Sequence, residues 1–319
     1  MSFADNCHIP VLLTQTLAAL AIRPDGIYVD CTFGRGGHSR ELLACVGPTG
    51  RVFALDKDPE AVRAGEDIAE RDSRFVIEKA SFARLADLAR TKWIVAGECI
   101  FGRVDGVLFD LGVSSPQLMD PERGFGFMAD GPLDMRMDPS TGLSAAQWLK
   151  SASEGEIRDV LRIYGEERHA RRIARAIVGE RQSSPIETTG RLAGLVARVS
   201  HSRERNKHPA TRTFQAIRIH INRELDELKD TLEQVPGVLA PGGRFAIISF
   251  HSLEDRLVKR FIRAYSREIV PPRRLPVMPN AALPLLVTAQ KRPVRPSAEE
   301  IAGNPKARSA LLRTAQKRP

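Results

Sequence analysis

Two features near the start of the chain have the residue types and the spacing of a nucleotide pocket. A short apolar run ends in a glycine cluster, Gly34-Arg35-Gly36-Gly37, and a helix is predicted to begin at His38 or Ser39. Glycine lets the backbone turn sharply and approach a ligand closely, and the first turn of a helix offers unpaired N–H groups. Asp56 ends the next apolar run, where a carboxylate can accept hydrogen bonds from ribose hydroxyls. We therefore predict a pocket for an adenosine-containing cofactor.

The third position of the glycine pattern decides which cofactor we expect. A dinucleotide-binding loop reads Gly-x-Gly-x-x-Gly, and its third glycine allows the helix to pack closely on the strand. Here that position is Ser39, the extra glycine is Gly37, and an acid, Asp30, lies inside the first strand. The pattern Asp-x-x-x-Gly-x-Gly-Gly is closer to the loop of S-adenosylmethionine enzymes, which faces a sulfonium and a carboxylate. A structural turn and a nicotinamide-dependent oxidoreductase are the alternatives, and Ser39 disfavours the second.

A second chemical candidate is the segment Asp110–Gln117, Asp-Leu-Gly-Val-Ser-Ser-Pro-Gln, which follows a predicted strand. The lone pair of an exocyclic amine on cytosine or adenine is conjugated with the ring, so this nitrogen is a poor nucleophile. Acceptors held against its N–H bonds draw the nitrogen toward sp³ geometry as a methyl group approaches. We predict that these acceptors are Asp110, Ser114, Ser115 and backbone carbonyls near Pro116. Two alternatives stay open, since Asp110 can instead serve the cofactor or cap a tight turn.

These candidates require strands that end beside one another, and the first third of the chain predicts such strands. Apolar, β-rich runs at 27–33, 51–56, 75–79 and 104–111 alternate with helical periods at 38–45, 59–70 and 82–92. Alternation of this kind produces a parallel sheet, and ligands bind beyond the carboxyl ends of its strands. The glycine cluster, Asp56 and Asp110 all fall at such ends.

The middle of the chain has a different pattern. Helical periods at 144–152, 154–164, 166–181 and 191–199 are not interrupted by a strand, which predicts an inserted α-helical domain. The sheet resumes after a long helix over 213–234, with a turn at 240–243, a buried strand at 244–250, a helix at 253–265 and late apolar runs at 284–289 and 310–315. Seven strands with a reversed pair at the end fit a Rossmann-like methyltransferase sheet. The predicted division is 1–117 and 213–319 for the sheet domain and 118–212 for the inserted domain.

Charge predicts a polyanionic partner. The chain has 319 residues and a formal net charge of +9, and residues 267–319 carry eleven Lys and Arg against three Asp and Glu. A second cluster follows helical spacing: Arg168, Arg171, Arg172, Arg175 and Arg181. Such clusters are typical of nucleic-acid binding, although a solvated helix face has the same composition.

Composition also excludes several classes of protein. The chain is 42% hydrophobic and 27% charged, as in an ordinary globular protein. Its cysteines, at 7, 31, 45 and 99, form no Cys-x-x-Cys pair, so we expect reduced thiols and no metal site. The apolar stretch 9–22 is interrupted by polar residues and no other run reaches membrane-spanning length. We therefore expect a cytoplasmic protein with no signal peptide and no membrane partner.

Eight short segments spread over the chain resemble the sequence motifs of one known family. They are His8-x-Pro10-Val11-Leu12-Leu13, Thr32–Ser39, Asp110–Gln117, Gly131–Asp138, Tyr164–Arg168, Lys207–Ala216, Ser249–Arg256 and Asn304-Pro305-x-Ala307-Arg308-Ser309. Through these segments nearly the whole chain resembles the RsmH/MraW family of bacterial methyltransferases. Residues 271–296 match no motif, so nothing is carried over to them.

The resemblance implies a Rossmann-like class I S-adenosylmethionine-dependent methyltransferase with an inserted α-helical domain. It implies methylation of the N4 amine of one cytidine in the decoding region of 16S rRNA, with the small ribosomal subunit as partner. The implied cofactor contacts are Gly36, Gly37 and His38, Asp56 on the ribose, Phe82 near the adenine, and Asp110 and Gln117; those of Phe82 and Gln117 rest on the resemblance alone. A non-catalytic RNA-binding module is the remaining alternative, and it would not need the intact segment Asp110–Gln117.

Overall fold

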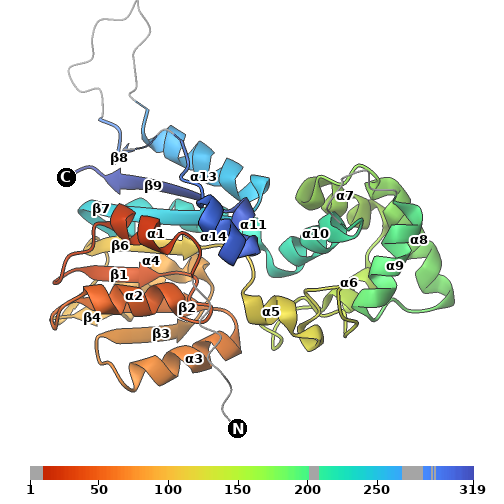
Figure 1. The fold of residues 1–319 in the computed structure, drawn as a ribbon, viewed down its shortest axis with the longest axis horizontal. Helices are drawn as coiled ribbons and strands as arrows, with labels where there is room; N and C mark the ends of the chain where they lie inside the picture. Colours follow the sequence, from red (N-terminus) through yellow and green to blue (C-terminus); the bar gives the residue numbers. More distant parts are fainter. Residues whose placement is uncertain (1–9, 201–207, 268–282, 289, 291) are drawn as a thin grey trace, which may run out of the picture. The chain divides into compact units, whose positions relative to one another are not determined.

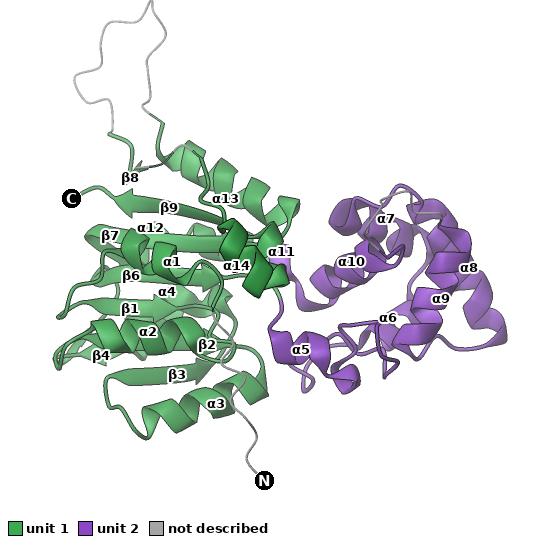
Figure 2. Cartoon of the chain, viewed as in Figure 1, with its two compact units in different colours: residues 1–112, 226–319 green, residues 113–225 purple. Residues whose placement is uncertain are grey.

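The computed structural model describes residues 10–200, 208–267, 283–288, 290 and 292–319. The chain forms two compact units: unit 1 contains residues 1–112 and 226–319, and unit 2 contains residues 113–225 (Figure 2). Each unit has its own buried core and is described by itself. Cys7, Lys207 and the basic pair Arg273-Arg274 lie outside the described residues. Across the described ranges, no helix is long and apolar enough to cross a membrane.

The centre of unit 1 is a seven-stranded sheet in the order β3-β2-β1-β6-β7-β9-β8 (Figure 1). Strands β3, β2, β1, β6 and β7 are parallel, whereas β9 is antiparallel to both β7 and β8. The strands are β1 (Ile27–Asp30), β2 (Arg51–Asp56), β3 (Phe75–Lys79), β6 (Val104–Asp110), β7 (Leu239–Ser249), β8 (Leu286–Val287) and β9 (Leu311–Lys317). The strand order reverses between β1 and β6, so the loops after these two strands open beside each other. The predicted Rossmann-like sheet with a reversed edge pair is confirmed.

Both faces of the sheet are covered because successive strand residues point to opposite sides. Leu108 of β6 faces one core, and its neighbours Val107 and Phe109 face the other. The first face packs against α1 (Leu13–Leu20), α2 (Gly37–Cys45) and α3 (Pro59–Ala69). The second packs against α4 (Leu85–Thr91), α11 (Glu224–Leu232), α12 (Val235–Val238) and α13 (Ser252–Tyr265).

Unit 2 is helical, and the helices predicted over 144–199 are confirmed with small shifts at their ends. They are α6 (Ala145–Ser151), α7 (Glu154–Gly165), α8 (Ala170–Ser183) and α9 (Thr189–Val199), preceded by α5 (Ser115–Met119) and followed by α10 (Thr211–Asn222). Capping boxes at Ser144 and Ser153 fix the starts of α6 and α7. Apolar side chains of these helices, among them Ile157, Ile173 and Ile217, form the core of unit 2.

The single helix predicted over 213–234 is wrong. Arg223 adopts a left-handed backbone with φ of 53°, which ends α10 and lets α11 begin in a new direction. Helix α10 packs on α7 inside unit 2. The second boundary between the units therefore lies at 225/226, where the sequence predicted 212/213. The first lies at 112/113, where the sequence predicted 117/118.

Two smaller features of unit 1 also differ from the prediction. The predicted turn at 240–243 belongs to β7, whose pairing with β6 shifts register between Val104 and Gly106. A short hairpin of β4 (Ile94–Val95) and β5 (Glu98–Cys99) has no counterpart in the prediction, because two-residue strands leave no periodicity to detect.

Candidate active site

The glycine turn after β1 is packed on one side and open on the other. Gly34 and Gly36 have positive φ angles of 58° and 74°, which favour glycine. A Cβ atom at Gly36 would lie 2.6 Å from the Phe33 ring, and one at Gly37 would lie 2.5 Å from Pro10 Cγ. The same position at Gly34 meets no atom within 4 Å. Gly37 begins α2, whose first-turn N–H groups have no partner inside the helix, so the open side can receive a polar ligand.

Asp56 ends β2 and fixes the glycine turn with its carboxylate. Its Oδ2 accepts a hydrogen bond from the Gly34 N–H at 2.8 Å, and its Oδ1 accepts one from the Asp58 N–H at 2.9 Å. Burial raises the pKa of Asp56 to about 6, although both bonds favour the charged form. Each oxygen keeps a second acceptor site, so Asp56 can bind hydroxyl groups while it holds the turn.

Ser39, which replaces the third glycine of the dinucleotide pattern, is buried and bonded to Asp30. Its Oγ donates to Asp30 Oδ2 at 2.7 Å, and the Thr32 N–H donates to Asp30 Oδ1 at 3.1 Å. Asp30 is 1% exposed, and burial raises its pKa to about 6. A hydrogen bond between α2 and β1 thus takes the place of the close packing that a third glycine would allow.

Asp110 ends β6, beside β1, and its carboxyl is only partly satisfied. Its backbone N–H donates to Thr32 Oγ1 at 2.6 Å, which joins the two strand ends. Oδ1 is buried without a hydrogen-bond partner among the described residues, and Oδ2 lies 3.7 Å from His38 Nδ1. Burial, with the nearby Asp30 and Glu254 carboxyls, raises the pKa of Asp110 to about 8. Burial also lowers the pKa of His38 to about 4, so this imidazole supplies no positive charge at neutral pH.

Phe82 follows β3 at the same edge of the sheet. It begins the 3-10 helix η1 (Phe82–Arg84), which Ser81 caps by accepting a hydrogen bond from the Ala83 N–H at 3.1 Å. The Phe82 ring meets the Phe109 ring edge-on, with 5.9 Å between centroids. The predicted residues of unit 1 therefore all follow or end neighbouring strands.

The other predicted residues belong to unit 2, where they form the start of α5. Ser114 is the N-cap: its Oγ accepts from the Gln117 N–H at 3.4 Å, and Gln117 Oε1 accepts from the Ser114 N–H at 2.9 Å. The Pro116 carbonyl accepts from the Asp120 N–H at 2.9 Å. The Ser115 hydroxyl has no hydrogen bond to any described residue. Of Ser114, Ser115 and Gln117, Ser115 is thus the residue whose polar side chain takes no part in the cap of α5.

Comparison with known proteins decides the family. The sequence profile of the MraW methylase family matches residues 5–318. The chain belongs to this family. Ribosomal RNA small subunit methyltransferase H of Thioalkalivibrio sulfidiphilus is 54% identical over 310 residues, 97% of each chain. The protein of that name from Chromobacterium violaceum is 54% identical over 319 residues, 99% of this chain and 97% of its own.

A solved rRNA methylase from Streptococcus thermophilus has a TM-score of 0.39 and 11% identity over 97% of this chain and 98% of its own, a likeness too weak to carry an assignment. Family membership is enough to identify an enzyme that takes its methyl group from S-adenosylmethionine. It decides against the nicotinamide-dependent oxidoreductase and the non-catalytic RNA-binding module.

Sequence reasoning missed three residues that support the site of this MraW methylase. Thr32 holds the backbone of Asp110, and Lys57 forms an ion pair with Glu227, with Nζ and Oε2 2.6 Å apart. Thr32 is the first residue of the motif Thr32–Ser39, and Lys57 directly follows Asp56, so their place in the chain was a usable signal. Glu227 lies far from any motif and only the fold brings it to the site.

The basic helix of unit 2 is only partly a surface for anions. Arg171, Arg172 and Arg175 of α8 are exposed, as is Arg168 just before it. Arg181, which was predicted to contact phosphates, is an exception. Its Nη1 donates to the Leu149 and Ala152 carbonyls at 2.5 and 2.6 Å, which ties the end of α8 to the end of α6.

Unit 1 carries a second basic face, of which the sequence analysis had counted only Arg267, within the basic stretch 267–319. Lys259, Arg260, Arg263 and Arg267 lie along and just beyond α13, and all four are exposed. The C-terminal strand is less available than its charge suggests. Arg313 Nε lies 2.6 Å from Asp255 Oδ1, and Lys317 Nζ donates to the Leu239 carbonyl at 2.6 Å.

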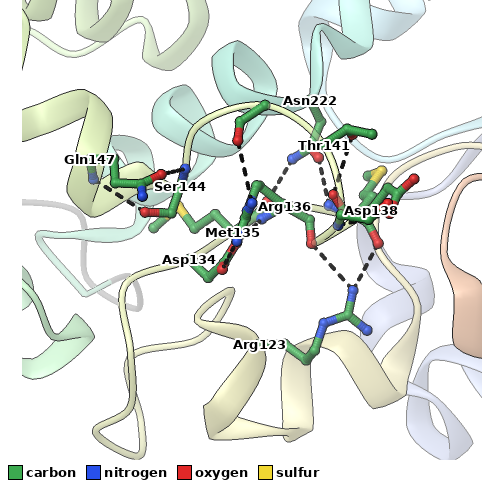
Figure 3. Close-up of polar contacts among 12 residues, drawn as sticks. Arg123, Asp134, Met135, Arg136, Asp138, Thr141, Ser144, Gln147 and Asn222 are labelled. Carbon is green, nitrogen blue, oxygen red and sulfur yellow. Dashed lines mark hydrogen bonds and ion pairs between the residues drawn. The ribbon is translucent and has the colours of Figure 1, made fainter.

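The motif Gly131–Asp138 forms a tightly held loop in unit 2 (Figure 3). Met135 is fully buried with φ of 64°, a strained conformation for this residue. Asn222 bonds the loop on both sides of Arg136: its Nδ2 donates to the Met135 carbonyl and its Oδ1 accepts from the Met137 N–H, both at 2.7 Å. Arg123 Nη2 donates to the Arg136 and Met137 carbonyls at 3.2 and 2.9 Å. Side-chain bonds from distant positions therefore maintain the strained backbone.

Proposed function

We propose that this MraW methylase transfers a methyl group from S-adenosylmethionine to the N4 amine of a cytidine in the 16S rRNA of the small ribosomal subunit, in the cytoplasm. The relatives named ribosomal RNA small subunit methyltransferase H, which match nearly the whole chain, support this substrate. The observation that carries the chemistry is the Asp110 carboxyl at the end of β6, which is half-buried and has one oxygen without a partner among the described residues.

The residues at the strand ends fit S-adenosylmethionine. Its sulfonium and ammonium groups are cations, and Asp30, Asp56 and Asp110 have raised pKa values that a bound cation would lower. The open side of Gly34 and the first turn of α2 suit a carboxylate. We assign the cofactor contacts to Gly34, Gly36, Gly37, His38, Asp56, Phe82 and Asp110, with Gln117 of unit 2 as the contact that the family resemblance adds.

The bound cofactor supplies a methyl group on a sulfonium, and the residues of the chain position and polarise the amine. Holding two reacting atoms about 3–3.5 Å apart and in line accounts for much of the acceleration in such transfers. Asp110 is proposed to accept a hydrogen bond from the amine. As the new N–C bond forms and the S–C bond of the cofactor breaks, the amine loses its proton to solvent or to a nearby acceptor. Ser115 is the second proposed acceptor, ahead of Ser114 and the Pro116 carbonyl, because these two already accept hydrogen bonds within α5.

The cysteines favour the amine over carbon C5 of cytosine as the target. Methylation at C5 needs a thiolate that attacks the ring. Cys31, one residue after β1, is the cysteine closest in sequence to the carboxyl ends of the parallel strands. Burial and the neighbouring Asp30 carboxyl hold the pKa of the Cys31 thiol well above its usual value, so it is a poor nucleophile. None of the chain's cysteines lies in the segment Asp110–Gln117.

The exposed cations of α8 and α13 are proposed to contact RNA phosphates, because exposed Arg and Lys on helical faces match a polyanion. The target cytosine must be single-stranded or turned out of its helix, since its amine has to reach a pocket.

Mass-spectrometric mapping of methylated nucleosides tests the proposal. The protein is incubated with S-adenosylmethionine and either 16S rRNA or small ribosomal subunits that lack the modification. The expected product is a cytidine methylated at N4 at one position. Methylation at C5 or at a base other than cytosine would overturn the proposed chemistry.

A further inference from the structure

Glu227 of α11 joins two loops of unit 1 that carry proposed cofactor contacts. Its Oε2 lies 2.6 Å from the Nζ of Lys57, the residue after Asp56. The same oxygen accepts a hydrogen bond from the Oγ of Ser81, the residue before Phe82, at 2.7 Å. The side chains of Lys57 and Glu227 are only 20% and 16% exposed, so water competes weakly with these contacts.

The Ser81 hydroxyl connects Glu227 to the turn that carries Phe82. While its proton is donated to Glu227, its oxygen accepts the Ala83 N–H that caps η1. A hydroxyl has one proton and two acceptor sites, so an acceptor at Glu227 leaves the lone pairs directed at the backbone. Glu227 thereby orients the cap of the turn from which the Phe82 ring projects.

The two loops leave the sheet at the point where Glu227 connects them. The register of β2 and β3 ends at Asp56 and Lys79, followed by a hydrogen bond from the Ala80 N–H to the Asp56 carbonyl at 2.9 Å. Gln234 holds the second loop, through bonds to the Ala83 carbonyl and the Ala86 N–H at 2.8 and 2.9 Å. Glu227 differs from Gln234 in bonding side chains of both loops.

We propose that Glu227 is a positioning residue for the cofactor, which fixes the spacing between the ribose loop at Asp56 and the adenine loop at Phe82. This inference rests on the cofactor contacts assigned under the proposed function. Glu227 is not assigned a contact with the cofactor or with RNA. Its loss is therefore expected to weaken cofactor binding and to leave methyl transfer at saturating cofactor nearly unchanged.

Substitutions in the full-length enzyme test this role by calorimetry with S-adenosylmethionine and by steady-state kinetics. Glu227→Ala is expected to raise the Kd and KM for the cofactor about ten-fold, the usual size for loss of a charged hydrogen bond, with little change in kcat. Glu227→Gln, which keeps the shape and an acceptor for Ser81 but loses the charge facing Lys57, is expected to fall between wild type and Glu227→Ala. It also keeps the test valid if the alanine variant does not fold. Adding Lys57→Met to Glu227→Ala should raise the Kd little further, because both changes remove the same ion pair.

Glu233→Gln is the matched control. It removes a negative charge just after α11, where Glu233 bonds the Tyr265 hydroxyl, and should leave the Kd for cofactor unchanged. Asp56→Ala reports on the assigned contacts separately. If Asp56→Ala weakens binding and both Glu227 variants bind normally, the positioning role is wrong and the proposed function stands. If Asp56→Ala also binds the cofactor normally, the assigned cofactor contacts are wrong as well. A lower kcat with a normal Kd in Glu227→Gln would likewise overturn the positioning role.

Discussion

At the scale of single residues, the carboxylate of Asp56 combines a structural function with a proposed binding function. It accepts the Gly34 N–H and is proposed to accept the ribose hydroxyls. Asp56→Ala should weaken cofactor binding by about 1–3 kcal/mol, because it leaves polar groups of turn and ligand unpaired. Calorimetry with S-adenosylmethionine measures the loss, and circular dichroism verifies that the variant is folded. Normal affinity in a folded variant would contradict the ribose assignment.

Asp110 can act on the cofactor, on the amine, or on both, and Asp110→Asn separates these roles. Asparagine preserves the shape but replaces one acceptor oxygen with a donor, which cannot accept the amine N–H. We expect the single-turnover rate of methyl transfer at saturating cofactor to fall by about 10²-fold or more, within the range for loss of one charge-stabilising hydrogen bond at the reacting atoms. A normal rate with poor cofactor affinity would assign Asp110 to binding alone.

The raised pKa of Asp110 predicts pH-dependent cofactor binding. Below about pH 8 this carboxyl is protonated in the cofactor-free protein, so binding of a cation must release a proton. Affinity should therefore rise with pH and level off above about 8, and Asp110→Asn should lose most of this dependence. Calorimetry in buffers of different ionisation enthalpy measures the released proton, and wild-type affinity that is flat between pH 6 and 8 would contradict the prediction.

The raised pKa of Asp110 also makes the cofactor-free protein less stable as pH rises from about 4, the ordinary carboxyl value, toward 8.

At the scale of elements, the strained loop at Met135 depends on one side chain of α10. Asn222 forms hydrogen bonds with the Met135 carbonyl, the Met137 N–H and the Arg218 carbonyl. Asn222→Ala should lower the free energy of unfolding of unit 2 by about 2–4 kcal/mol, since buried backbone groups lose their partners. Thermal unfolding measures this, with Gln147→Ala, which removes an exposed capping contact of α6, as a milder control of about 0.5–1 kcal/mol. Equal losses in the two variants would show that the loop does not depend on Asn222.

At the scale of the whole molecule, the basic residues behind the net charge of +9 fall into two groups. Some are exposed on α8 and α13, and others, such as Arg181, Arg313 and Lys317, bond groups within the protein. Neutralising Arg171 and Arg172 on α8, or Lys259 and Arg263 on α13, should weaken RNA binding and reduce its salt dependence by about one unit of slope for each phosphate that is no longer neutralised. Arg181→Gln should instead destabilise unit 2 and leave the salt slope nearly unchanged, because its guanidinium bonds carbonyls of α6 and its C-cap. Titration of RNA at several salt concentrations distinguishes these outcomes. If the salt dependence of RNA affinity is unchanged in both double variants, the two faces are solvated and do not contact RNA.

The sequence alone determined the features that depend on neighbours in the chain. Strands β2 and β3 have their predicted bounds, and β1 and β6 end within three residues of theirs, because apolar runs and turn residues act locally. Since parallel strands present their carboxyl ends at one edge, the same reasoning placed Asp56 and Asp110 at that edge. The cofactor roles of these residues remain proposals.

Only the tertiary structure decided the features that depend on residues distant in sequence. The break at Arg223, the internal bonds of Arg181 and the connection of Glu227 to Lys57 and Ser81 each require side chains or helices that meet through the fold. A long charged side chain can face solvent or reach a buried partner, and its own sequence neighbourhood is the same in either case. The choice depends on which backbone lies within reach after the helices have packed, and no local pattern in the sequence contains that information.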